Sequence, residues 1–192
     1  MLENAESSSS IYEGLKKLLI EIGEDPSRNG LLDTPKRIEK QLRECMSGYG
    51  KNPDDHIVLF DDNNSHGSLV SVLSISFSSL CEHHVLPFYG YVDIAYVPSN
   101  KILGLSKFAR IVDVFSKRLQ VQERLTHEIA DFLAAKLEPE LLMVRVSATH
   151  SCMGIRGVNR HQSKTETFAI CGSNTQPHQH HISYFMHNRG EA

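Results

Sequence analysis

Two short clusters of cysteine and histidine are the residues of this chain most able to do chemistry. Residues 81–84 read Cys-Glu-His-His, and residues 150–152 read His-Ser-Cys. A cysteine and a histidine three residues apart can both reach one ion from a turn, and a thiolate with an imidazole suits zinc. Three protein ligands and a water molecule are typical of a catalytic zinc site, and four protein ligands are typical of a structural one. Together the two clusters predict a metal site.

Both clusters follow predicted strands, which would bring them together. Apolar residues alternate with serine over residues 73–77, before the first cluster, and a second alternating run at residues 142–148 precedes the other. Because side chains two apart in a strand share a face, we expect His150 and Cys152 to point inward with the apolar residues. Buried cysteines beside incidental histidines are the simpler alternative. A zinc deaminase is disfavoured because the chain has no Cys-x-x-Cys.

Around these clusters, the hydrophobic periodicity predicts an α+β fold. Residues 92–96 alternate as a further strand, two apolar stripes of helical spacing lie within residues 108–133, and residues 164–171 predict a last strand. Strands, then two helices, then strands again indicate an antiparallel sheet with both helices on one face.

The N-terminal part of the chain is predicted to be helical. Ser10 and Glu13 have the spacing of a capping box, and Thr34 with Pro35 begins a second helix that ends near Gly48. We therefore divide the chain into a disordered N-terminus at residues 1–10, an N-terminal helical region at residues 11–66 and a domain that carries the sheet at residues 67–192.

Composition and charge exclude several classes of partner. The chain has 192 residues, a hydrophobic fraction of 40% and a net charge of -3, so we expect no nucleic-acid partner and no membrane surface as a partner. No apolar run approaches the roughly 20 residues of a membrane helix, and the serine-rich N-terminus lacks the features of a secretory signal. The four cysteines are therefore expected to be thiols or metal ligands in a cytoplasmic protein. The histidine-rich residues 178–185 are expected to be a solvated tail, with a second metal site there as the less favoured alternative.

The chain resembles the GTP cyclohydrolase I family over nearly all of residues 10–172. The resemblance rests on five stretches in the same order, which are GLLDTPKR at residues 30–37, CEHHVLPF at 81–88, GLSKFAR at 104–110, LQVQERL at 119–125 and HSCMGIRG at 150–157. It implies a tunnelling fold, in which subunits assemble into an oligomeric barrel and two rings stack into a homodecamer with active sites between subunits. It also raises the question of a regulatory protein or feedback ligand.

The resemblance also implies a reaction and the residues that perform it. The family hydrolyses C8 of GTP, releases formate and forms 7,8-dihydroneopterin triphosphate for folate or tetrahydrobiopterin synthesis. Zinc would lower the pKa of a bound water toward ~7, so that hydroxide becomes available to attack C8. A histidine titrates near neutrality and so suits proton transfer. The resemblance makes Cys81, His84 and Cys152 the zinc ligands, His150 the proton donor to N7, and His83 a catalytic residue in later steps.

Substrate-binding residues are implied in the same way. Ser106, Lys107 and Arg110 stand at a helix start, which favours anions, and Arg156 adds a planar fork suited to phosphate. Gln122 and Glu123 open the next helix, where a glutamate can accept hydrogen bonds from N1–H and the 2-amino group of guanine. The simpler alternative for these residues is an ordinary solvated helix face, with the glutamate complementing the helix dipole.

Two other functions are compatible with the sequence. One is a divergent zinc hydrolase of the same fold that acts on another purine nucleotide. The other is a protein without catalytic activity, in which zinc only holds the fold together. The number of protein ligands discriminates the second, because a closed site with four ligands would indicate a structural metal.

Overall fold

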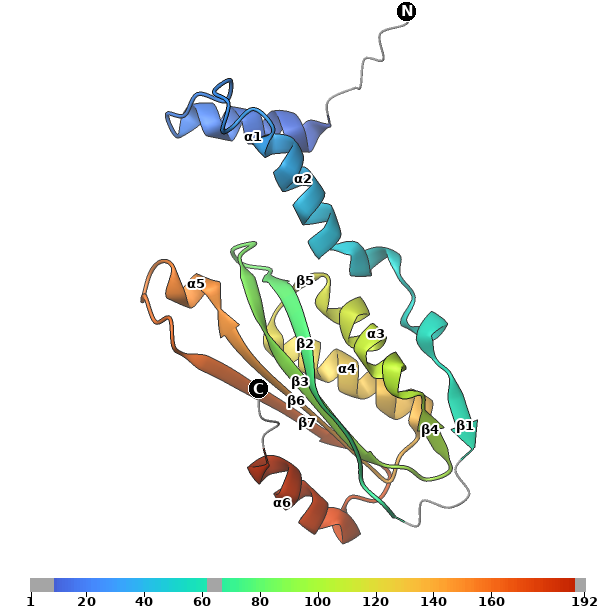
Figure 1. Ribbon diagram of the computed structural model, residues 1–192. Helices are drawn as coiled ribbons and strands as arrows, with labels where there is room; N and C mark the ends of the chain where they lie inside the picture. The colour runs from blue at the N-terminus through green and yellow to red at the C-terminus, as the bar shows by residue number, and fades with distance from the viewer. Residues whose placement is uncertain (1–8, 62–66, 189–192) are drawn as a thin grey trace, which may run out of the picture. The chain divides into compact units, whose positions relative to one another are not determined.

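The computed structural model describes residues 9–61 and 67–188 (Figure 1). Its contacts divide the chain into two units, residues 1–45 and residues 46–192, and each is described by itself. The predicted boundary after residue 66 does not coincide with this division, because the segment that follows residue 45 contacts the second unit. The Gly48 N–H, for example, donates to the Lys117 carbonyl at 2.8 Å. The disorder predicted for residues 1–10 falls mainly on residues that lie outside the described ranges.

The first unit consists of the two predicted helices, α1 (Ser10–Glu21) and α2 (Thr34–Cys45). Helix α1 begins one residue earlier than the capping box predicts, because its N-cap is Ser9, whose hydroxyl accepts from the Tyr12 N–H at 3.2 Å. The same hydroxyl donates to Glu39 of α2 at 2.7 Å. One serine therefore both caps the first helix and joins it to the second.

The second unit contains a five-stranded sheet with the order β5-β2-β3-β6-β7. The predicted α+β fold is confirmed, since α3 and α4 both pack on one face of this sheet (Figure 1). All strand pairs in it are antiparallel except β2 with β5. The elements of this unit are η1 (Ser47–Gly50), η2 (Pro53–His56), β1 (Leu59–Asp61), β2 (Val70–Cys81), β3 (Pro87–Val97), β4 (Lys101–Leu103), α3 (Leu105–Ser116), β5 (Leu119–Gln120), α4 (Gln122–Leu137), β6 (Leu141–His150), α5 (Ser151–Gly154), β7 (Lys164–Cys171), η3 (Gln176–His178) and α6 (Gln179–His187).

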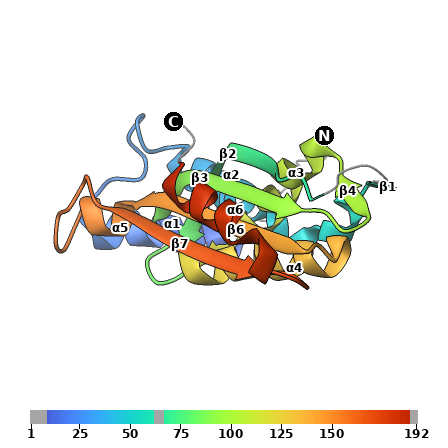
Figure 2. The same ribbon diagram turned by 90° about the horizontal axis from the view of Figure 1, so that it is seen from below.

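Alternation along the strands gives the sheet two apolar faces. On β6, Leu142 and Val144 face the core under α3 and α4, whereas Met143 belongs to a smaller cluster that includes Phe185 of α6. Figure 2 shows α6 crossing the strands of the sheet. The expectation of a solvated C-terminal tail is therefore wrong, because Phe185 is only 3% exposed. Among the described helices, none has the length and apolarity needed to cross a membrane.

A bulge in β2 makes the pattern of inward-facing residues differ from the predicted one. The pairing of β2 with β3 shifts between Val72 and Ile75, and Ser74 between them has a positive φ of 57°. The side chain of Leu73, which was predicted to face inward, is instead 44% exposed. A bulge changes the alternation of a strand by one residue, so Val72 and Ile75 both pack against the core.

A buried ion pair on the α6 face of the sheet holds this irregular region together. Arg145 on β6 donates through Nε to Asp93 on β3 at 2.9 Å, and Asp93 also accepts from the backbone N–H of Ser74 at 2.7 Å. Arg145 further donates to the carbonyls of Phe185 and Asn188, each at 3.0 Å, at the end of α6. The pair therefore joins the bulge, two central strands and the C-terminal helix.

We expect Asp93→Ala to lower the free energy of unfolding by about 3–5 kcal/mol, because it leaves a buried guanidinium without its carboxylate. Urea denaturation measures this. Asp54→Ala is the matched control, since it breaks an exposed pair with Lys136 and should change the free energy by less than about 1 kcal/mol. A similarly small loss in Asp93→Ala would contradict the role of the buried pair.

Candidate metal centre

The two predicted clusters meet at one end of the sheet. The ligand atoms of Cys81, His84 and Cys152 all lie within 4.8 Å of one another, and Cys81 Sγ is 3.7 Å from His84 Nδ1. Within the described ranges, this is the one such group of three cysteine, histidine or acidic side chains. Two sulfur atoms and one imidazole nitrogen form a donor set that suits zinc.

The turn after β2 presents the first two ligands. Cys81 closes this turn with its own backbone, because its N–H donates to the Leu86 carbonyl and its carbonyl accepts from the Val85 N–H, both at 2.8 Å. Val85 has a positive φ of 53°, which reverses the chain toward β3. Cys81 is buried and His84 is exposed, so the group spans the boundary between core and solvent.

Cys152 reaches the group by a different route from the predicted one. Strand β6 ends at His150, and Cys152 lies in the single helical turn α5. The alternation of the strand therefore carries His150 but not Cys152, whose side chain is directed by the helical turn. Burial raises the pKa of the Cys152 thiol, the nearby Cys81 sulfur raises it further, and Arg156 opposes both. A metal ion at this position would bind the thiolate and displace the proton.

His150 is held between a ring and an amide. Its imidazole stacks on Phe88, with ring centroids 4.7 Å apart and planes within 3°, and its Nε2 lies 2.8 Å from Oε1 of Gln122. Burial lowers the pKa of His150, and the carboxylate of Glu123 partly opposes this shift. The catalytic histidine predicted from the sequence is therefore fixed in orientation and only partly accessible.

Gln122 determines which nitrogen of His150 carries a proton. Its Nε2 donates to the backbone carbonyls of Val146 and Thr165, each at 2.9 Å. Carbonyls only accept, so the amide nitrogen must face them and the amide oxygen must face His150. The Nε2 of His150 is then the donor, and its Nδ1 is left for chemistry. Gln122 is only 1% exposed and its amide oxygen contacts His150, so it positions this histidine, and its contact with substrate stays a prediction.

Three other predicted residues lie close to the centre. The Nδ1 of His83 is 3.8 Å from Cys81 Sγ. The charges of Glu123 and Arg156 act on His150 and on Cys152 respectively. All three side chains are exposed at this end of the unit, where they could meet a ligand.

The predicted anion-binding residues lie elsewhere in the chain. Ser106, Lys107 and Arg110 belong to the first turns of α3, which begins just after β4 and runs toward β5 (Figure 1). The metal group lies beside β5, where Cys81 pairs with Gln120. A helix of this length spans about 18 Å, so Ser106 and Lys107, in its first turn, lie at the end away from the metal group, and Arg110 lies about half-way along it.

Comparison with known proteins agrees with the geometry. The model of the GTP cyclohydrolase I family matches residues 11–188. The chain belongs to this family. It is 45% identical to GTP cyclohydrolase 1 of Bacillus subtilis, covering 86% of this chain and 87% of the relative. It is 46% identical to the Streptococcus gordonii enzyme of the same name, covering 93% and 97%, and 42% identical to that of Rickettsia typhi, covering 97% and 100%.

We expect Gln122→Glu to lower the free energy of unfolding by at least about 2 kcal/mol, because its carboxylate would face two carbonyls that cannot donate to it. Chemical denaturation measures the change. Glu123→Gln is the matched control, since it alters the neighbouring exposed side chain and should cost less than about 1 kcal/mol. Equal stability of Gln122→Glu and the wild type would show that the amide is not needed.

Proposed function

We propose that the protein opens the imidazole ring of GTP by zinc-dependent hydrolysis at C8. The reaction would release formate and rearrange the ribose to give 7,8-dihydroneopterin triphosphate, which would enter folate or tetrahydrobiopterin synthesis in the cytoplasm. Membership of the GTP cyclohydrolase I family supports GTP as the substrate. The observation that carries the chemistry is the group of Cys81, His84 and Cys152 beside the oriented histidine His150.

Zinc fits the donor set that the chain provides. Two thiols and one imidazole converge within 4.8 Å, and three protein ligands are typical of catalytic rather than structural zinc. We assign Cys81, His84 and Cys152 as these ligands. When bound, the ion supplies Lewis-acid activation of water near neutral pH.

His150 is suited to move a proton at the purine. Its Nε2 is occupied by Gln122, so Nδ1 is the atom that would deliver a proton to N7 as the ring opens. Burial lowers the His150 pKa, and the nearby carboxylate of Glu123 opposes only part of this shift; a lowered pKa makes the protonated imidazole a stronger acid, which suits delivery of a proton. We propose that His83, which lies beside Cys81, assists the later steps near the ribose.

The remaining exposed residues would hold the nucleotide. Glu123 can accept from N1–H and the 2-amino group of guanine through its two carboxylate oxygens. Arg156 can bind phosphate oxygens in pairs. Since Ser106, Lys107 and Arg110 begin a helix that starts far from the metal group, we propose that a second copy of the chain brings its own set to the triphosphate. The protein would then work as a homo-oligomer, and we propose a decamer.

The metal assignment predicts about one zinc ion per purified chain. Cys81→Ser and Cys152→Ser should each lose most of this zinc, because a hydroxyl is a poor substitute for a thiolate ligand. Cys171→Ser is the matched control, since Cys171 is a free cysteine on β7 outside the group, and it should retain the metal. Elemental analysis of the variants decides the matter, and wild-type zinc content in both ligand variants would remove the assignment.

The reaction itself is tested with GTP. We expect the wild type to release formate and to form a pterin that fluoresces after oxidation. His150→Ala should keep its zinc but lose turnover by about 10²–10⁴-fold, the usual contribution of a general acid. Formate assays on both proteins measure this. Near-normal turnover in His150→Ala would exclude it from the mechanism, and no formate from the wild type would exclude the function.

A shared active site predicts that two inactive variants restore each other. Arg110→Ala and His150→Ala each damage a different part of the site, and co-assembly of the two chains should leave about one shared site in four intact. We therefore expect co-expressed chains to show clear formate release, while each variant alone shows little. Co-expressed chains no more active than the better single variant would indicate that each chain uses its own Arg110.

A further inference from the structure

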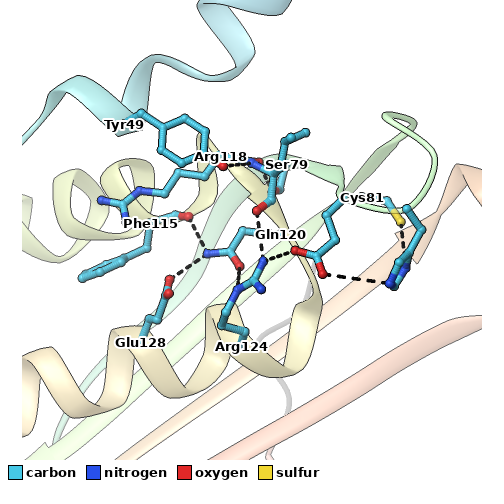
Figure 3. Close-up of polar contacts among 11 residues, drawn as sticks. Tyr49, Ser79, Cys81, Phe115, Arg118, Gln120, Arg124 and Glu128 are labelled. Atoms are coloured by element: carbon cyan, nitrogen blue, oxygen red, sulfur yellow. Dashed lines mark hydrogen bonds and ion pairs between the residues drawn. The ribbon is translucent and has the colours of Figure 1, made fainter.

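A chain of polar side chains runs from helix α4 to the metal-binding turn (Figure 3). Arg124, on the first turns of α4, donates to a carboxylate oxygen of Glu82. The same guanidinium donates to the Leu119 carbonyl at 3.1 Å and to Oε1 of Gln120 at 2.9 Å. One arginine therefore joins α4, β5 and the residue between Cys81 and His83.

Gln120 holds Arg124 at the α4 end of this row of polar side chains. It is only 1% exposed, and its Nε2 donates to the Phe115 carbonyl at 3.0 Å and to Glu128 at 2.7 Å. Because both partners are acceptors, the amide oxygen must point to Arg124. The arginine is thus held by a buried amide whose orientation is determined, and the Glu82 carboxylate raises its pKa.

Glu82 is held by its backbone as well as by its side chain. Its N–H donates to the Gln120 carbonyl at 3.0 Å, and one carboxylate oxygen is taken by Arg124. The other oxygen, Oε1, lies 3.9 Å from Nε2 of His83. On its opposite side, the His83 ring has Nδ1 3.8 Å from Cys81 Sγ. His83 therefore lies between a metal ligand and a carboxylate that is itself held in place.

We propose that Glu82 and Arg124 are positioning residues that set the orientation of His83 at the active site. Arg124 holds one carboxylate oxygen of Glu82. The other oxygen faces Nε2 of His83 and keeps this exposed imidazole close to the metal-binding turn. This inference rests on the proposed function for the role of His83. It adds two residues to the site, Arg124 on α4 and Glu82 in the metal-binding turn. Both act through His83 and do not touch the substrate.

A purely stabilising role does not explain this arrangement. The side chains of Arg124 and Glu82 are 42% and 34% exposed, and ion pairs of this kind contribute little to stability. The arginine nevertheless makes three directional contacts, which a lysine ammonium on a flexible stem does not reproduce. These contacts fix the orientation of the Glu82 carboxylate.

The test is a set of double-mutant cycles on the zinc-loaded enzyme with GTP. Glu82→Gln should lower kcat about 10–100-fold, the usual effect of losing a group that orients an active-site side chain, while KM, zinc content and Tm stay near wild type. Arg124→Lys should lower kcat in the same way. If both residues act through His83, the double variant Glu82→Gln, His83→Ala should have the same kcat as His83→Ala alone. The double variant Glu82→Gln, Arg124→Lys should likewise have the same kcat as Glu82→Gln alone. Multiplying effects, or wild-type kcat in Glu82→Gln, would overturn the proposal.

Glu24→Gln is the matched control, because Glu24 pairs with Arg28 at 2.9 Å in the N-terminal unit, and it should leave kcat unchanged. Crystal structures of zinc-loaded wild type and Glu82→Gln separate this proposal from the proposed function. They should show the His83 ring directed at Glu82 in the wild type and turned away in the variant, whether or not GTP is the substrate. The same ring orientation in both would overturn the positioning role, whereas failure of the wild type to release formate would overturn only the proposed function.

Discussion

Strand β3 determines where the chemistry can occur, because it pairs with both strands that carry the site. Its first residue, Pro87, pairs with Leu80 at the end of β2, and its second, Phe88, pairs with His150 at the end of β6. The two clusters are 69 residues apart in the sequence but lie at the same end of β3, on either side of its first residues. A slip of one residue in either pairing would turn the side chains to the opposite face and separate the thiols. The metal group therefore depends on backbone register before it depends on any side chain.

Two buried glutamines, held by the backbone, then orient the side chains of the site. Gln122 directs its amide nitrogen at two backbone carbonyls, and Gln120 directs its own at one carbonyl and the Glu128 carboxylate. Each leaves its amide oxygen for one functional partner. For Gln122 the partner is His150 itself, and for Gln120 it is Arg124, which holds Glu82. An amide suits this purpose because it has a donor end and an acceptor end, so a fixed backbone on one side specifies the hydrogen bond on the other. Both glutamines and Arg124 lie within residues 120–124, so the end of β5 and the start of α4 together orient the side chains of the site.

The sequence could predict what depends on local pattern and on motif. Alternation and helical spacing located the main strands and helices, and the paired clusters predicted the group that includes Cys81 and Cys152. The bulge at Ser74 could not be predicted, because it is stabilised by Asp93, nineteen residues away. The docking of α6 was missed for a similar reason, since Phe185 finds its apolar partners on β3 and β6. The parity argument failed at Cys152 because a strand pattern cannot reveal where the strand ends.

The five-stranded sheet has open edges among the described residues. Strand β7 pairs only with β6 along its eight residues, and β5 pairs only with β2 over two, within the part of the chain that the structure describes. Unpaired edges of this kind invite pairing with another strand. In the same chain, Ser106 and Lys107 lie in the first turn of α3, at the end of the helix away from β5 and the metal group. A second copy that pairs along an open edge would cover exposed backbone groups and could supply the missing cations. We infer that pairing with a second copy would both cover the open strand edges and supply the cations. Assembly and catalysis would then depend on the same contact.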